Sequence, residues 1–207
     1  SHWSDFSSLS VEFQRARPNM ILGVPRVFEK VRNGAAANAQ DNGPLRAAAF
    51  AQAERVAQDY SRALDTPEGP SRALRMKHAM FDKLVYSKIR AAMGASVKYC
   101  ISGGSAMSPD LLHFFRGMGV TVYEGYGLTE TTAAAAVNFD DNVIGSVGRP
   151  VGGMSARIND DGEILLRGET LFDGYWNNSE ATAENIDQEG WFNTGDLGEL
   201  LDSGHIV

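Results

Sequence analysis

The stretch VKYCISGGSAMSPDLLHFFRGMGVTVYEGYGLTE (97–130) decides the expected fold of this chain. It begins with VKYCI (97–101), a short run rich in β-branched and aromatic residues, which is typical of a strand. The glycine turn SGGSAMSP (102–109) follows, then a helical pattern over 110–118, and TVYEG (121–125) begins another strand directly afterwards. Strand, turn, helix and strand in this order predict an α/β unit with parallel strands.

Two glycine-bearing segments lie where these expected strands end. GGS (103–105) follows the first strand, and GYG (125–127) follows the second. In open sheets of this type, ligands bind outside the carboxyl ends of the strands. We therefore expect a binding site at this edge.

The segment YEGYGLTE (123–130) places four kinds of chemical group within eight residues. Glycines lack Cβ, so they allow close approach to a flat ligand and turns that other residues avoid. The ring of Tyr126 can stack on a purine, which contributes about 1–3 kcal/mol. Thr129 offers a hydroxyl for a phosphoryl oxygen, and Glu130 offers a hard oxygen ligand for Mg²⁺. Together they predict a nucleotide-plus-metal site, although a GxG beside a tyrosine is also an ordinary turn and a glutamate an ordinary surface acid.

A second cluster is EGWFNTGDLGE (189–199), in which Asp196 follows a Thr-Gly pair. A turn at this point would fix the carboxylate at the edge of a pocket, where both hydroxyls of a ribose could donate to it. The alternative is a turn aspartate that accepts a hydrogen bond from its own backbone. We expect Trp191 to be a packing residue. The histidines are scattered and form neither a catalytic triad nor a metal site; they are His2, His78, His113 and His205.

The first part of the chain reads as helices. Residues 27–31 after Pro25 have helical apolar spacing, and residues 45–64 read as an amphipathic helix that ends before TPEGP (66–70). Between them, NGAAANAQDNGP (33–44) reads as a polar connection and the least ordered stretch. A further helix is expected over 71–93, with one face formed by Leu74, His78, Phe81, Leu84, Val85 and Ile89.

After Asn138 the pattern becomes turn-rich and β-like. ARINDDGEILLRG (156–168) predicts a hairpin around the Asp-Gly pair 161–162, and GELLDSGHIV (198–207) predicts another. The expected fold class is therefore a parallel-sheet α/β subdomain with flanking helices, followed by a β-rich subdomain that resembles a small barrel. We assign residues 1–142 to the first subdomain and residues 143–207 to the second.

Composition limits the classes of partner. The chain has 207 residues, 43% of them hydrophobic, and a net charge of −7 without a long basic run, which argues against nucleic acid as the main partner. A phosphorylated small molecule is not excluded, because backbone amides and a bound cation can outweigh a weak overall charge. No stretch has the length of a membrane-spanning helix, and no signal peptide opens the chain. The single cysteine, Cys100, suits a reducing cytosol, and we expect it to be a small apolar residue in a strand.

Six segments occur in an order that resembles the adenylate-forming superfamily of acyl-CoA ligases, luciferases and peptide-synthetase adenylation domains. They are SGGSAMS (102–108), YEGYGLTE (123–130), GSVGRP (145–150), GEILLRG (162–168), FDGYWNN (172–178) and GWFNTGDLG (190–198). ILGVPRVFEKV (21–31) and Glu124 are similar to the long-chain fatty acyl-CoA synthetase branch, since other branches more often carry glutamine at that position. The resemblance spans nearly the whole chain except the variable helical region 33–95.

The resemblance implies a reaction and a set of site residues. The family activates a carboxylate with ATP to an acyl-adenylate, releases pyrophosphate, and transfers the acyl group to coenzyme A. Carried over by motif position, Thr129 contacts the α-phosphate, Glu130 binds Mg²⁺, and Asp196 binds the ribose hydroxyls. The remaining motif positions line the adenine and acyl-carbonyl region, with the ring of Tyr126 on the adenine; they are Gly103, Gly104, Ser105, Glu124, Gly125, Tyr126, Gly127 and Leu128.

The resemblance also implies parts that this sequence does not contain, namely an upstream phosphate loop ending in lysine and a C-terminal lid that carries a lysine. We therefore expect these 207 residues to be inactive alone. The implied substrates are a fatty acid, ATP and coenzyme A, and the implied location is the cytoplasm. A hydrophobic substrate suggests transient membrane contact, although no amphipathic basic helix is convincing in the sequence. Two alternatives remain open: a ligase for another carboxylic acid or for a carrier-protein acceptor, and a nucleotide-binding module that has lost the reaction.

Overall fold

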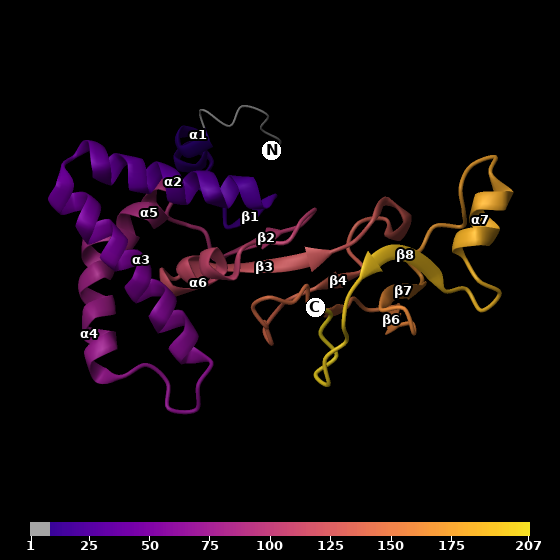
Figure 1. Cartoon of the computed structure of the whole chain (residues 1–207). Coiled ribbons are helices and arrows are strands. Elements are labelled where there is room, and N and C mark those ends of the chain that lie inside the picture. The colour runs from indigo at the N-terminus through magenta and orange to yellow at the C-terminus, as the bar shows by residue number, and fades with distance from the viewer. Residues whose placement is uncertain (1–8) are drawn as a thin grey trace. The chain divides into compact units, whose positions relative to one another are not determined.

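The computed structural model describes residues 9–207 of the chain and divides them into two compact units (Figure 1). The first unit comprises the described residues up to Ser102 together with Ala106–Val122. The second comprises Gly103–Ser105 and Tyr123–Val207. His2 lies outside the described residues.

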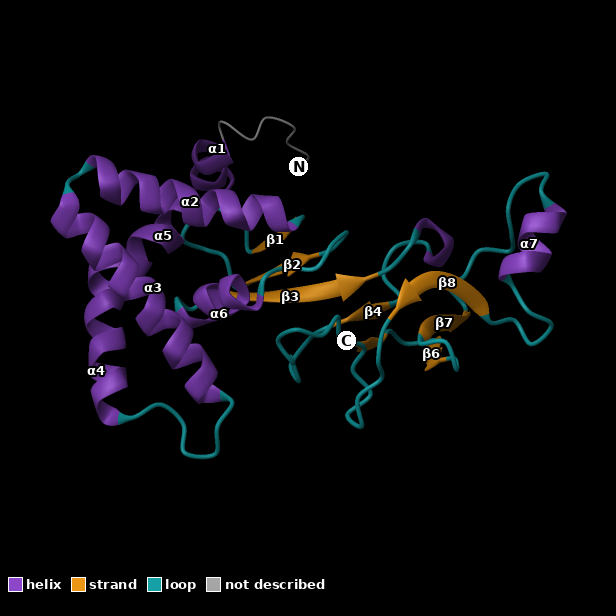
Figure 2. Cartoon of the chain, viewed as in Figure 1, coloured by secondary structure: helices purple, strands orange, loops and turns teal. Residues whose placement is uncertain are grey.

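The first unit is mainly helical, with two short parallel strands (Figure 2). Ile21 is the partner of Cys100 in the pairing of these strands. The helices are α1 (Leu9–Ala16), α2 (Pro25–Asp41), α3 (Pro44–Leu64), α4 (Arg72–Phe81), a π-helical turn (Asp82–Tyr86), α5 (Ser87–Ala92) and α6 (Pro109–Gly117), and the strands are β1 (Met20–Gly23) and β2 (Tyr99–Ser102). The strand, helix and apolar thiol expected from 97–118 are confirmed, because Cys100 is fully buried in β2.

Aromatic side chains form much of the core of the first unit. Phe28 of α2 meets Phe115 of α6 edge to face, with ring centroids 5.6 Å apart. Helix α3 packs closely on α6. The short distance is clear at Gly117, where an added Cβ would lie only 2.0 Å from the carbonyl oxygen of Ala57. The hydroxyl of Tyr86 donates to the carbonyl of Ala53 at 2.6 Å inside this core.

Two sequence expectations for this unit are wrong in part. Residues 33–41 belong to helix α2 and not to a poorly ordered connection, since alanine has high helix propensity and the helix starts at Pro25, which is well suited to a first helical position. The helix expected over 71–93 is present, but its π-helical turn shifts the side chains. Leu84, expected on the inner face, is 55% exposed, and Tyr86 is fully buried instead.

The second unit is mainly β. Strand β3 (Thr121–Tyr126) enters it at Tyr123 and pairs antiparallel with β4 (Ala136–Val137), which pairs antiparallel with β5 (Arg149–Pro150). A separate antiparallel sheet has the order β6 (Met154–Ile158), β7 (Glu163–Gly168) and β8 (Phe192–Leu197). A 3₁₀ turn (Thr129–Thr131) and helix α7 (Ser179–Asn185) complete the unit. The hairpin predicted around residues 161–162 is confirmed as β6–β7, and Gly162 has the positive φ of 84° that suits its turn.

Small and branched apolar residues form the core of the second unit. The buried cluster consists of Ala135, Ala136, Met154, Ile164, Leu166 and Ile206. Tyr126 is half-buried and packs against this cluster, so the core of the unit holds one side of the candidate nucleotide loop. The end of the chain turns back with a single antiparallel bridge between Leu200 and Ile206, which makes the second predicted hairpin a short one.

The boundary between the two observed units falls within residues 102–123 of the chain, whereas the sequence assigned one subdomain to 1–142 and another to 143–207. The units are groups of residues in mutual contact, and β3 passes from one to the other because it pairs with β4 at its far end. These contact-based units do not test the expected division into two subdomains at residue 142, which stays a prediction. No helix within residues 9–207 is both long enough and apolar enough to cross a membrane.

Candidate nucleotide site

The candidate residues from two distant motifs meet in the second unit. The hydroxyl of Tyr126, at the end of β3, donates a hydrogen bond to Oδ2 of Asp196, at the end of β8, over 2.6 Å. Burial raises the pKa of Tyr126, and so does the hydrogen bond to Asp196, so the phenol stays protonated and remains a donor. Seventy residues of sequence separate the two side chains. The expectation that YEGYG and TGD serve one place is therefore supported by a direct contact.

Neighbouring groups hold the Asp196 turn in shape. The hydroxyl of Thr194 donates to the carbonyl of Ile164 at 2.7 Å and accepts from the backbone N–H of Asp196 at 3.1 Å. The backbone N–H of Gly195 donates to Oε1 of Glu163 at 2.8 Å. The Asp196 backbone is thus tied down, while its carboxylate is exposed and accepts from Tyr126. The alternative of a carboxylate bonded only to its own turn does not describe this arrangement.

Glu130 is held by a tyrosine that the sequence analysis did not single out. The hydroxyl of Tyr175 donates to Oε1 of Glu130 at 3.0 Å, and the backbone N–H of Phe172 donates to the Glu130 carbonyl at 2.7 Å. Desolvation raises the pKa of Tyr175, as does its hydrogen bond to the Glu130 carboxylate. Both partners lie in FDGYWNN (172–178), which carried the resemblance without an assigned role. The sequence did contain a signal for this pair. Glu130 had an expected ligand role, and Tyr175 lies in another motif of the same family.

The turn between Leu128 and Ala133 is organised by one buried hydroxyl. Oγ1 of Thr131 accepts from the backbone N–H of Leu128 at 2.9 Å and lies 3.1 Å from the carbonyl oxygens of both Leu128 and Ala133. The next two residues have positive φ angles, 58° at Thr132 and 127° at Ala133. Such angles in residues with a Cβ cost about 1–3 kcal/mol each and are concentrated at functional sites. Thr129, by contrast, is exposed at the start of the turn.

The structure explains the two glycines of GYG by contacts within the protein, whereas the sequence analysis explained them by close approach to a flat ligand. Gly127 approaches its own chain, because a Cβ there would lie 1.5 Å from the carbonyl oxygen of Ala133. Gly125 is a strand residue opposite Val137, whose Cγ2 would be 3.4 Å from an added Cβ. Neither glycine has the positive φ that only glycine adopts easily. Close packing within the protein therefore explains Gly127 without a ligand.

The remaining candidates surround the end of β3. Gly103 lies against Gly125, since an added Cβ would be 3.4 Å from the Gly125 carbonyl oxygen, and Gly104 has a φ of 85°. Ser105 is exposed, whereas Glu124 is only 6% exposed. The structure brings the first glycine turn to the second, as expected for two strand ends. The adenine-binding roles of these residues stay predictions.

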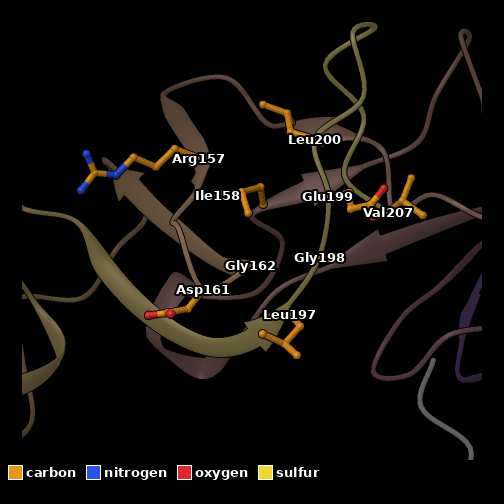
Figure 3. A pocket seen from close by; sticks show the side chains of 9 residues that line it. All are labelled: Arg157, Ile158, Asp161, Gly162, Leu197, Gly198, Glu199, Leu200 and Val207. Carbon is orange, nitrogen blue, oxygen red and sulfur yellow. The ribbon is translucent and has the colours of Figure 1, made fainter.

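A hollow in the surface of the second unit lies away from these residues. A pocket of about 1010 Å³ is lined by residues of β6, the end of β8 and the last residue of the chain, as Figure 3 shows; they are Arg157, Ile158, Asp161, Gly162, Leu197, Gly198, Glu199, Leu200 and Val207. None of the candidate residues is among them. The lining contains no serine, cysteine or histidine, so the hydrogen-bonded Tyr126–Asp196 pair remains the stronger indication of a site.

The structure also describes Trp191 and two of the histidines. Trp191 is buried and has two guanidinium groups over its ring, with Arg157 at 4.4 Å and Arg167 at 4.7 Å from the ring centroid, which confirms its packing role. His78 stacks on Tyr60 with a centroid separation of 3.9 Å, and His205 is buried beside Asp141. No group of three or more potential metal-ligating side chains occurs among residues 9–207.

Comparison with solved structures identifies the fold. The chain is similar to the N-terminal domain of FACL13 from Mycobacterium tuberculosis, with a TM-score of 0.62 and 21% identity over 98% of this chain and 41% of that one. It is similar to the M. tuberculosis fatty acyl CoA synthetase, with a TM-score of 0.61 and 21% identity over 98% of this chain and 32% of that one. The fold is therefore that of the N-terminal part of acyl-CoA synthetases.

The sequence comparisons identify the family. A model described as AMP-binding enzyme matches residues 2–176, so the chain belongs to the AMP-binding enzyme family. It is 48% identical to the long-chain-fatty-acid–CoA ligase FadD15 of Mycobacterium bovis over 99% of this chain and 34% of the relative. It is 32% identical to the peroxisomal long chain acyl-CoA synthetase 7 of Arabidopsis thaliana over 98% of this chain and 30% of that protein. The chain thus spans about a third of the length of the curated relatives that it matches, and the family resemblance drawn from the motifs is confirmed.

Proposed function

We propose that the chain is the nucleotide-holding part of a long-chain fatty acid–CoA ligase. In the first step a carboxylate oxygen of the fatty acid bonds to the α-phosphorus of ATP, and the bond to pyrophosphate breaks. In the second step the thiolate sulfur of coenzyme A bonds to the acyl carbon, and AMP leaves with the electron pair of the broken C–O bond. The names of relatives at 47–48% identity favour a long-chain fatty acid as the substrate.

The observation that carries this proposal is the 2.6 Å hydrogen bond between Tyr126 and Asp196. It places a half-buried aromatic ring beside an exposed carboxylate, the two groups that an adenosine needs for its base and its ribose. Because the Tyr126 hydroxyl occupies one carboxylate oxygen, it orients the carboxylate, whose remaining acceptor capacity can receive the ribose hydroxyls. The ring, packed on the core of the unit, is held in place before the nucleotide binds.

The residues fit a magnesium ion that is shared with the substrate. Mg²⁺ usually keeps several waters and is bound by one or two carboxylates together with substrate phosphates. Glu130 offers such a carboxylate, oriented by Tyr175, and the described residues hold no metal cage that would bind the ion alone. Bound there, Mg²⁺ would neutralise negative charge on the phosphates. Thr129, exposed one residue earlier, would donate its hydroxyl to an α-phosphate oxygen and so orient the group under attack.

We further propose a cytoplasmic location, because the single cysteine is buried in β2 and suits a reducing compartment. Since the chain spans about a third of the length of its relatives, we expect the 207 residues alone to bind an adenylate weakly and not to turn over. The fatty acid-, ATP- and CoA-dependent formation of AMP by the full-length protein and by the isolated chain tests both statements. Robust turnover by the isolated chain would contradict the second.

The role of each acid is tested in the full-length protein by ATP–pyrophosphate exchange. Glu130→Ala should lower the exchange rate at saturating ATP, because it removes the carboxylate that orients the metal and the phosphates. Asp196→Ala should mainly raise the KM for ATP, because it removes the acceptor for the ribose. An Asp196→Ala enzyme with an unchanged KM for ATP would contradict the ribose assignment. Acids of graded chain length, and a carrier protein offered in place of coenzyme A, separate the proposed ligase from one for other acids or acceptors.

A further inference from the structure

The segment that carries Asp196 is a bulge in the second sheet. Glu163 of β7 pairs with Leu197 of β8, and the next aligned pair is Leu165 with Asn193. One residue of β7 thus faces three residues of β8, and the last of these three is Asp196. A bulge interrupts the ladder of backbone hydrogen bonds and often re-aims a side chain beside a functional site. The ladder therefore does not fix the direction of the Asp196 carboxylate, and other groups must do so.

Side chains supply the hydrogen bonds that the ladder lacks in this bulge. Thr194 lies within the bulge, and its hydroxyl bonds to the backbone of both strands. Glu163 acts from the neighbouring strand, since its Oε1 accepts from the backbone N–H of Gly195 at 2.8 Å. Gly195 has a φ of 75°, which glycine adopts without a steric penalty. Glu163 thus holds the residue directly before Asp196.

The carboxylate of Glu163 is itself held at both oxygens. Its Oε2 accepts from Nδ2 of Asn159 at 3.3 Å. The amide of Asn159 is kept in this orientation by its own oxygen, which accepts from the backbone N–H of Asp161 at 3.0 Å and of Glu163 at 2.9 Å. Both Asn159 and Glu163 are half-buried. A carboxylate bonded at both oxygens keeps one direction, so it can impose a position on the bulge.

The charge of Glu163 also acts on the other member of the pair. Burial is the main cause of the raised pKa of Tyr126, the hydrogen bond to Asp196 adds to it, and so do the negative charges of Asp196 and Glu163. Glu163 therefore favours the protonated phenol that donates to Asp196. One carboxylate thus influences both side chains of the candidate nucleotide site.

We propose that Glu163 is a positioning residue of the nucleotide site, which fixes the bulge through Gly195 and so directs the Asp196 carboxylate toward Tyr126 and the ribose of ATP. Glu163 acts through Asp196 and does not itself contact the nucleotide. The inference rests on the proposed function, in which Asp196 accepts from the ribose hydroxyls. Because Gly195 is exposed, water can replace Glu163 as the partner of its N–H. Loss of Glu163 should therefore cost little stability and mainly change the direction of Asp196.

ATP–pyrophosphate exchange by the full-length protein tests this proposal. Glu163→Ala should raise the KM for ATP about tenfold, near the low end of what a hydrogen bond to a charged group contributes, and leave kcat within about twofold. Glu163→Gln should keep the KM within about threefold, because its carbonyl oxygen can still accept from Gly195, the shorter of the two bonds. An unchanged KM in Glu163→Ala, or an equal rise in Glu163→Gln, would overturn the proposal.

Asp187 offers a matched control, because its carboxylate also holds a turn next to β8. Its Oδ1 accepts from the backbone N–H of Glu189 at 2.9 Å and of Trp191 at 2.8 Å. This turn precedes β8, whereas the bulge lies near the end of that strand. Asp187→Ala should lower Tm at least as much as Glu163→Ala does and leave the KM for ATP unchanged. A rise in KM equal to that of Glu163→Ala would show general loosening of the sheet and overturn the assignment.

The double variant Glu163→Ala/Asp196→Ala separates this proposal from the proposed function. If Glu163 acts through Asp196, the KM of the double variant should lie within about twofold of that of Asp196→Ala alone. Effects that multiply in the double variant would overturn the proposal, because Glu163 would then act independently of Asp196. A KM that rises in Asp196→Ala but not in Glu163→Ala would refute the positioning role alone. An unchanged KM in Asp196→Ala would instead contradict the ribose assignment, and the positioning role with it.

Discussion

Replacing Gly127 with alanine separates two explanations of the glycine in GYG. The structure gives an internal reason, because an added Cβ would lie 1.5 Å from the carbonyl oxygen of Ala133, 2.6 Å from its carbon and 2.9 Å from Cα of Ala134. Ordinary contacts of a Cβ begin near 3.4 Å. The segment around Ala133 must therefore move by about 2 Å, which close-packed interiors do not absorb without loss of contacts. The other explanation, close approach to a flat ligand, predicts no change in the free protein.

The size of the effect follows from what the displacement breaks. The hydroxyl of Thr131 bonds to the backbone of Leu128 and Ala133, and each such bond contributes about 1 kcal/mol. Overpacking adds about 1–3 kcal/mol. The free energy of unfolding should thus fall by about 3–5 kcal/mol, which lowers Tm by about 10 °C for a protein of this size.

Thermal unfolding followed by circular dichroism measures this loss. The matched control is Gly152→Ala, because nothing lies within 4 Å of a Cβ added at Gly152 and its φ is not in the left-handed region. We expect the control to unfold within about 1 kcal/mol of the unmodified protein. If Gly127→Ala is as stable as Gly152→Ala and loses only nucleotide binding, the packing explanation is refuted and the ligand explanation is supported.

Three further predictions follow from the same contacts. Tyr126→Phe keeps the ring and removes the donor to Asp196, so the Kd for AMP should rise about fivefold when measured by calorimetry. An unchanged Kd would count against orientation of Asp196 by the hydroxyl. Tyr175→Phe removes the donor to Glu130 and should raise the Mg²⁺ concentration needed for half-maximal pyrophosphate exchange without altering the KM of the fatty acid, whereas a shift in that KM alone would contradict the pairing. Burial raises the pKa of Cys100 from 9.0 to about 12, so the unfolded chain loses this thiol proton at lower pH than the folded chain. The stabilisation it gives is complete below pH 9 and should be lost as the pH rises from about 9 toward 12; chemical denaturation across this range should show a smaller loss in Cys100→Ala.

The sequence predicts those parts of the structure that depend on local pattern. The strand at Cys100, the helix that follows, the strand ending at Tyr126 and the hairpin at Gly162 all combine a periodic apolar pattern with a turn signal. The family resemblance predicted that Tyr126 and Asp196 bind the same nucleotide, but nothing in the sequence predicted their direct hydrogen bond. The residues between them give no local signal of where the second β-sheet places the end of β8.

The features that the sequence did not predict depend on tertiary structure or on small differences in energy. Residues 33–41 contain polar and glycine positions that suggest a connection, yet their alanines and the start at Pro25 favour the helix. The π-helical turn adds one residue to a helical repeat, so periodicity misassigns Leu84 and misses Tyr86.

The central claim is that Tyr126 and Asp196 together hold an adenine nucleotide. Its most direct test is calorimetric titration of the full-length protein and its variants with a nonhydrolysable acyl-adenylate mimic. We predict that Asp196→Ala and Tyr126→Ala each weaken binding strongly, that the double variant loses little more, and that Asp202→Ala, which changes an exposed acid in a later turn of the chain, binds as the unmodified protein does. Binding of the mimic that is unchanged in both single variants would contradict the account.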